Sequence, residues 1–301
     1  MRILKLGLTA VACVVGLSVP VPTAVAQELY DDAFVIASDA DERRKSNMAS
    51  RQEMLIERMI ETACFAMIDV ETEANWTRLE QAHRLFMLSQ TALRDGNAAL
   101  GLGPETNERV INALDLVDKR YKPFDEMIQQ IITDRSFDSD ALRALDSKAK
   151  GIEKAVSRVQ STIDGIYLRR SYPMRAIVGL NFIGKERVTS QSITRNYCLI
   201  AADVDAEVHR IHLQNDAKLF QSRLEALLVG EPLVGLPPAP TGAIADQIGE
   251  ALRIWAEMLP AIDQAMGRNE IRDDHVTLIS DHATPLLAAV NQAVYLYESV
   301  Q

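Results

Sequence analysis

The chain contains an internal repeat that aligns with itself without a gap. A shift of 134 residues superposes residues 47–130 on residues 181–264 and gives 16 identities among the 84 aligned positions. Average composition predicts about five. The identical pairs include Asn47/Asn181, Cys64/Cys198, two glycine pairs and one proline pair; the glycines and the proline lie where helices are expected to end or begin. Because these residues fix backbone geometry, the repeat predicts two similar structural units.

Hydrophobic residues within each copy follow a helical period. From Met48 through Met59 to Val70, apolar residues recur at spacings of three, four and seven, the pattern of a helix that faces a core. No convincing strand alternation appears. Breaks in the pattern predict four helices per copy, at residues 28–71, 75–95, 106–133 and 139–171, and again at 174–204, 207–229, 241–266 and 270–299. We therefore expect an all-α fold of two tandem antiparallel four-helix bundles.

Short polar side chains mark where several of these helices begin. Thr106 and Thr241 precede apolar runs, and either Asp138 or Ser139 precedes the run that starts at Ala141. Side-chain oxygens of these types accept hydrogen bonds from the first amides of a helix. We predict them as N-caps.

The N-terminal segment has the pattern of a secretory signal peptide. Residues 1–26 combine basic residues, an apolar run and an Ala24-Val25-Ala26 cleavage site. A lipoprotein modified at Cys13 is the alternative, but its apolar segment would be very short and it lacks leucine three places upstream. We expect a signal peptide at 1–26, a first domain at 27–172 and a second at 173–301. Their boundary falls at Tyr172-Pro173, because the residue before proline avoids helical geometry.

Charge and motif content exclude several classes of function. Without Arg2 and Lys5 of the signal peptide, 30 basic residues face 42 acidic ones, a net charge of −12, which argues against nucleic-acid binding. No later stretch is apolar enough to span a membrane, so we expect a periplasmic protein. No phosphate loop, nucleophile elbow or His-Glu-x-x-His motif is found. We predict no enzymatic activity and no cofactor.

Two equivalent stretches carry a resemblance to a known family. The segments "NMASRQEML" and "GLNFIGKERVTSQ", followed by "ACFAMIDV" and "YCLIAADV", resemble the type IV pili methyl-accepting chemotaxis transducer N-terminal domain. The pattern is also similar to the ligand-binding segment of nitrate and nitrite sensor kinases, whose first-helix arginines from two subunits hold a small oxyanion. Family members usually continue into a membrane helix and an output domain, whereas this chain stops at Gln301. The resemblance therefore implies signalling through a membrane-bound partner protein.

The resemblance also implies a set of ligand-binding residues. Arginine suits this role because its planar fork matches an oxyanion and stays charged in a partly dry groove. The second copy has Arg187 at the sensor position, but the first has Glu53 there, a departure that weakens anion binding. If the two first helices pack together, Arg51, Arg58 and Arg187 would converge. The full candidate set is Asn47, Arg51, Arg58, Asn181, Lys185 and Arg187.

Several readings stay open at this point. The charges at 51, 53, 57 and 58 can instead form the solvated face of a helix. Cys64 and Cys198 are expected as small buried thiols, and a disulfide requires the two equivalent helices to touch. His209-x-x-His212 has metal-ligand spacing but no clear third ligand, so an exposed, hydrated pair is favoured.

Two classes of function follow. The first is a periplasmic sensor-like protein that binds a small oxyanion such as nitrate or nitrite and signals through its membrane partner. The alternative is a structural or interaction module of an envelope or pilus-related assembly that has no small ligand.

Overall fold

The structure is a computed structural model that describes residues 41–168, 174–267 and 270–300. The predicted signal peptide, Cys13, the start of the first helix at residue 28 and the boundary at Tyr172-Pro173 lie outside these residues. All regular structure in the described ranges is helical, apart from two isolated β-bridges. The prediction of an all-α helical bundle is confirmed. None of the helices in these ranges is both long and apolar enough to cross a membrane.

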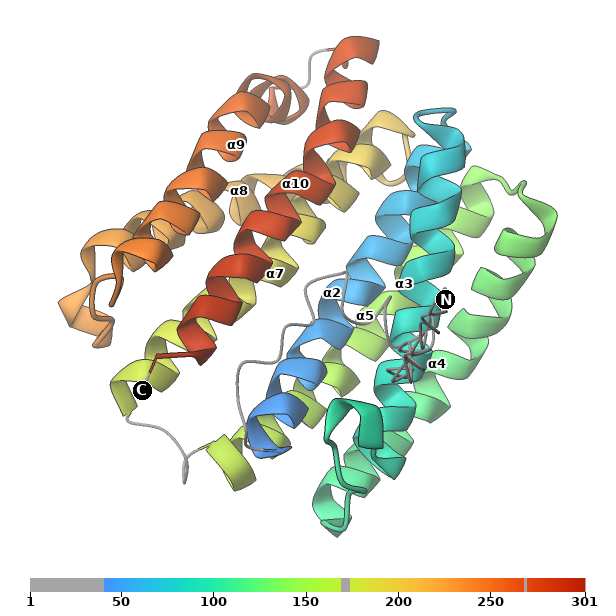
Figure 1. The fold of residues 1–301 in the computed structure, drawn as a ribbon. Helices are drawn as coiled ribbons and strands as arrows, with labels where there is room; N and C mark the ends of the chain where they lie inside the picture. The colour runs from blue at the N-terminus through green and yellow to red at the C-terminus, as the bar shows by residue number, and fades with distance from the viewer. Residues whose placement is uncertain (1–40, 169–173, 268–269, 301) are drawn as a thin grey trace, which may run out of the picture.

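The first half of the chain forms four long helices (Figure 1). They are α2 Asp41–Met67, α3 Thr72–Asp95, α4 Glu108–Asp134 and α5 Ser139–Ile163, with a 3-10 turn η1 at Ala98–Leu100 and a π-helical turn η2 at Asp164–Leu168. Helix α2 packs against α3 and α5, and α4 packs against the same two neighbours. Their apolar faces, rich in leucine, isoleucine and alanine, form the core.

The second half repeats this order. It comprises α7 Met174–Ala201, α8 Ala206–Val229, the 3-10 turn η3 Pro232–Val234, α9 Gly242–Met266 and α10 Asp273–Glu298. Helix α7 packs against α8 and α10, and α9 packs against the same pair. The described helix bounds agree with the predicted ones to within a few residues, except that α5 ends at Ile163, where the π-helical turn η2 begins, rather than at the predicted residue 171. The domain division at residue 172 stays a prediction.

Matching turns follow α2 and α7. Asp69 and Glu71 adopt left-handed φ values of 60° and 41°, and their repeat equivalents Asp203 and Asp205 have 53° and 45°. Left-handed residues end a helix, so α2 stops at Met67 rather than at the predicted residue 71. The backbone of the turn is therefore repeated, although the second of its two acids is Glu71 in the first copy and Asp205 in the second.

Capping residues agree with two of the three predictions. The side chain of Asp138 accepts a hydrogen bond from the amide of Ala141, and that of Thr241 accepts one from the amide of Ile244. The predicted cap at Thr106 is wrong. Asn107, one residue further on, caps α4 by accepting from the amide of Arg109, since asparagine is the stronger capping residue of the two.

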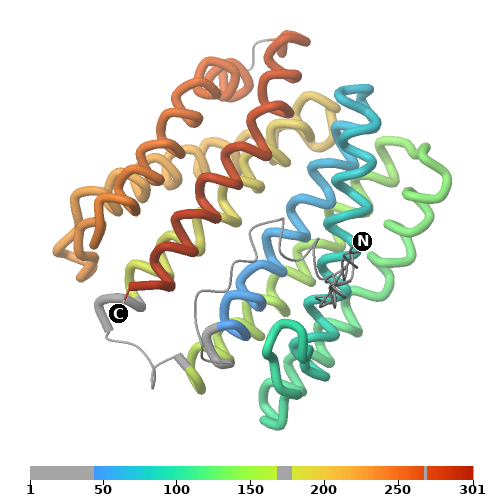
Figure 2. Tube along the Cα trace, viewed as in Figure 1, coloured from blue at the N-terminus to red at the C-terminus, as the bar shows by residue number. Residues whose placement is uncertain are grey.

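Helices α2 and α7 lie next to each other at the centre of the molecule (Figures 1 and 2). Arg187, halfway along α7, bonds to Asn47 near the start of α2, and Cys64 forms a disulfide with Cys198 near the C-terminal ends of both helices, so the helices run parallel. The Cα atoms of the two cysteines are 6.1 Å apart. The expectation of free buried thiols is therefore wrong, because the equivalent helices touch.

Candidate functional site

The charged residues at the start of the repeat are buried. The exposed fractions of Arg51, Glu57 and Arg58 are 4%, 5% and 9%, and Glu53 is half-buried. The interpretation of these charges as a solvated helix face is wrong. Helix α2 packs against α3, α5 and α7 at once, which leaves it no broad solvent-facing side. Buried charges need compensating partners, so each of them marks a place where the protein supplies one or a ligand can.

Arg51 and Arg58 line a common cavity of about 100 Å³ between α2, α3 and α10, which we call the arginine cavity. Its other walls are mostly apolar, and none of its lining residues in the described part of the chain is acidic. The remaining lining residues are Met54, Leu55, Ala82, Leu85, Thr284, Leu287, Ala288 and Asn291. The cavity therefore presents two guanidinium groups in a mostly apolar setting.

The side-chain hydrogen bonds of Arg58 go to neutral acceptors. Its Nη1 donates to Oε1 of Gln191 on α7 and its Nη2 to Oγ1 of Thr284 on α10, each at 3.4 Å. One turn further along α2, burial raises the pKa of the Glu61 carboxyl to about 7, and the nearby charge of Arg58 only partly opposes this rise. Because both bonds are long, Arg58 retains capacity to bind an anion.

Arg187 lies elsewhere on the same helix pair. It is 2% exposed, and its Nη1 donates to Oδ1 of Asn47 at 3.0 Å, which joins two of the predicted site residues. Burial lowers the pKa of Arg187 to about 10, an effect that the charge of Glu298 only partly opposes, and its Nε has no hydrogen-bond partner among the described residues. Arg187 is not among the residues that line the arginine cavity. Asn181 and Lys185 are exposed on α7 and do not line that cavity either.

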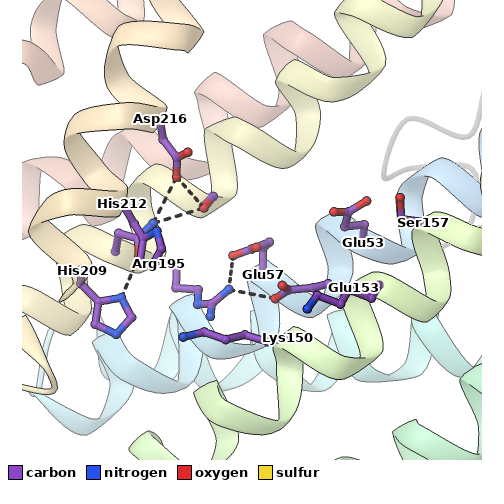
Figure 3. Close-up of a pocket in the computed structure, with 12 residues that line it drawn as sticks. Glu53, Glu57, Lys150, Glu153, Ser157, Arg195, His209, His212 and Asp216 are labelled. Atoms are coloured by element: carbon purple, nitrogen blue, oxygen red, sulfur yellow. Dashed lines mark hydrogen bonds and ion pairs between the residues drawn. The ribbon is translucent and has the colours of Figure 1, made fainter.

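A larger cavity, of about 520 Å³, lies between α2, α5, α7 and α8, and we call it the polar cavity. Figure 3 shows His209, His212 and Asp216 at one end, Glu53 and Ser157 at the other, and Arg195 with Glu57 between them. Every lining residue is polar or charged. The set is Glu53, Glu57, Lys150, Glu153, Lys154, Ser157, Ser192, Arg195, Asn196, His209, His212 and Asp216.

Arg195 organises the middle of the polar cavity. Its Nη1 donates to Oε2 of Glu57 at 2.6 Å and to Oε1 of Glu153 at 3.1 Å, and its Nε donates to Oδ1 of Asp146 at 3.0 Å. One guanidinium thus holds three carboxylates from α2 and α5. Burial, opposed by Arg195 and reinforced by Glu153, raises the pKa of Glu57 to about 8. This cluster was not predicted from the sequence, although an arginine three residues before Cys198, in the segment "SITRNYCLI", was a usable signal.

Only one histidine of the His209-x-x-His212 pair matches its prediction. His212 is exposed, but His209 is 2% exposed and its Nδ1 lies 2.8 Å from Oδ1 of Asn196. Burial lowers the pKa of His209 to about 4, so the ring is neutral at pH 7. The expectation of an exposed pair is wrong for His209, because α8 turns it toward α7. In the described ranges, no three His, Cys, Asp or Glu residues are grouped so as to hold a metal ion.

Residues 179–278 match the family described as "PilJ: Type IV pili methyl-accepting chemotaxis transducer N-term". The match lies within the second half and confirms the family resemblance there. It covers α8, α9 and most of α7, and α7 is the helix that supplies both Arg187 and Arg195. No curated protein and no solved structure shows significant similarity to the chain. The family match suggests a role in sensing or signalling.

Proposed function

We propose, from the transducer-domain match over residues 179–278, that this protein is a non-enzymatic, periplasmic binding protein. In this proposal it recognises a small oxyanion such as nitrate or nitrite and passes its occupancy to a membrane-bound partner protein. The single observation that carries the ligand class is the arginine cavity, where Arg51 and Arg58 meet with no acidic residue among the lining side chains.

The size and chemistry of the arginine cavity favour an inorganic anion. Its volume of about 100 Å³ is that of a few water molecules and falls below the roughly 300 Å³ at which pockets for organic ligands begin. Arginine forms paired, charge-assisted hydrogen bonds with planar oxyanions and keeps its charge when buried.

The position of the cavity supports a signalling role. Its walls come from α2 and α3 of the first half and α10 of the second, and Arg58 reaches Gln191 on α7. A ligand there contacts elements of both halves, so its binding energy can depend on how they are arranged. Such differential binding is what coupling to a partner requires.

Isothermal titration calorimetry with nitrate, nitrite, sulfate and chloride tests the proposal. We expect saturable binding of at least one oxyanion, and a loss of about tenfold or more in Arg58→Met, because a hydrogen bond to a charged group contributes about 1.5–3 kcal/mol. The exposed Arg109 provides the control variant Arg109→Met, which should bind as the wild type does. Arg187→Ala should weaken binding less than Arg58→Met, since Arg187 lies outside the cavity. Equal affinity in the wild type and Arg58→Met would refute the site.

A structural or interaction module is the second candidate. Val229, Leu233 and Val234, at the turn between α8 and α9, are 78%, 94% and 53% exposed, and exposed apolar groups often mark contacts with other proteins. A melting temperature that rises with an oxyanion favours the sensor. Co-purification with an envelope complex, unchanged by any added anion, favours the module.

A further inference from the structure

We propose that the polar cavity is a second ligand site, which binds a small zwitterion with an ammonium and a carboxylate group, of the size of a free amino acid. This site is independent of the proposed anion site, because the polar cavity and the arginine cavity share no lining residue. Its volume of about 520 Å³ falls within the range of pockets that hold small organic molecules.

The interior of the polar cavity carries an excess of negative charge. Arg195 is already bonded to Glu57, Asp146 and Glu153, so its single positive charge is shared among three carboxylates. Glu53 adds a fourth carboxylate, and within the described residues it makes no hydrogen bond or ion pair. Burial, with the charge of Glu153, raises the pKa of Glu53 to about 7 despite Lys185 nearby. A cation in the cavity would offset this repulsion.

An ammonium group fits the arrangement of these acids. It is a compact charge with three hydrogen-bond donors and no acceptor. Glu53 and Glu57 lie one turn apart on α2, and Glu153 faces them from α5 (Figure 3). Three donors can therefore be matched by three carboxylates from two helices. A hydrogen bond to a charged partner is stronger than one between neutral groups.

The rim of the cavity selects against a second cation on the ligand. Lys150 and Lys154 on α5 line the cavity and are exposed residues, so both add positive charge to its lining. A diamine would bring its far charge toward these lysines, whereas a carboxylate there can pair with them. Ser157 adds a hydroxyl group that can bond to the same carboxylate, whereas the hydroxyl of Ser192 already donates to Oδ2 of Asp216. An acidic interior with a basic rim matches a zwitterion.

Calorimetric titration of the full chain with the standard free amino acids tests this assignment. At least one amino acid should bind saturably. Its affinity should fall about tenfold or more in Glu53→Gln and in Lys154→Met, since about 1.4 kcal/mol corresponds to each factor of ten. The exposed Glu126 on α4 gives the control Glu126→Gln, which should bind normally. Arg58→Met should also bind the amino acid normally, which separates this site from the anion site.

Three outcomes overturn the proposal. One is the absence of binding by every amino acid at concentrations up to about 10 mM, well above a millimolar Kd. Another is tighter binding of 1,4-diaminobutane than of any amino acid, which would assign the cavity to diamines. The third is unchanged amino-acid affinity in both Glu53→Gln and Lys154→Met when their circular dichroism matches that of the wild type.

Discussion

The two central helices occupy equivalent places in the repeat but carry opposite charges at two aligned positions. Glu61 of α2 corresponds to Arg195 of α7, and Glu53 corresponds to Arg187. In a pair of identical helices, the contact that joins Glu57 to Arg195 would instead bring Glu57 beside Glu61, and two buried carboxylates would repel. Duplication within one chain allows each copy to change separately. The charges of α2 and α7 can therefore pair across their interface because the two helices are not identical.

The backbone of the two halves differs far less than their side chains. Gly96 and Gly230 both have positive φ, and a Cβ on either would lie within 2.8 Å of backbone atoms of the following loop. Yet Leu100 is 4% exposed, while its equivalent Val234 is 53% exposed. Arg44 of α2 donates to the carbonyl of Gly101 beside Leu100. The second copy has Val178 in place of Arg44, so it lacks this guanidinium.

The asymmetry of the interface is broken most strongly by removing Arg195. Arg195→Met leaves Glu57, Asp146 and Glu153 buried without their cation, and we expect the free energy of unfolding to fall by about 3–5 kcal/mol. Urea denaturation at pH 7 measures this loss. Arg143, which pairs with Asp140 and Asp205 at the surface, is the matched control. Arg143→Met should cost about 1 kcal/mol or less, and similar losses in the two variants would contradict the prediction.

Removing the disulfide tests the covalent link between α2 and α7. It closes a segment of 134 residues, so its removal restores conformational freedom to the unfolded chain. Replacing both residues, Cys64→Ala with Cys198→Ala, should lower the unfolding free energy by about 2–4 kcal/mol. Differential scanning calorimetry under oxidising conditions measures the change. Two titratable thiols in the denatured, unreduced chain 27–301 that lacks Cys13 would show that the bond is absent.

Leu100 and Val234 occupy equivalent positions in the two loops but differ in burial. Leu100→Ala empties a buried site and should cost about 2–3 kcal/mol. Val234→Ala removes an exposed side chain, and surface substitutions usually stay within about 0.5 kcal/mol. Chemical denaturation of the two variants side by side gives the difference. Equal costs would mean that Val234 is covered in solution as Leu100 is.

The smallest expected effect on stability is that of replacing Glu53, whose equivalent in the second copy is Arg187. Burial raises the pKa of Glu53 from its ordinary value of 4.5 to about 7. The folded state therefore binds a proton between these values that the unfolded state does not. The stability associated with Glu53 is present below pH 4.5 and is lost as the pH rises through about 7.

Glu53→Gln should consequently be more stable than the wild type at pH 8, by roughly 1–2 kcal/mol after allowance for solvent. At pH 4.5 and below, the two proteins should have equal stability. Melting temperatures measured from pH 4 to pH 8 provide the test, with Glu126→Gln as the control that follows the wild type. A constant difference across this range would exclude a titrating Glu53.

Much of the fold was predictable because its signals are local. Helical periodicity, the caps Asp138 and Thr241 and the repeated glycines depend on residues close in sequence, and the structure places the helices accordingly. The candidate site was predictable only in part. The sequence named Arg51, Arg58 and Arg187, but it could not show that the first two share a cavity and that the third bonds to Asn47. The cluster around Arg195 was missed because Arg195 and its acids lie on three helices that are far apart in the sequence.

The sequence by itself determined that the chain is helical, that its helices follow one pattern twice, and that its second copy matches a transducer sensor family. Only the tertiary structure decided which charges are buried, that Cys64 bonds to Cys198, and that two cavities open beside α2. The physical reason is the range of the interactions. Helix formation depends on neighbours a few residues apart, whereas burial and pairing depend on the contact of α2 with α7, whose equivalent residues are 134 positions apart.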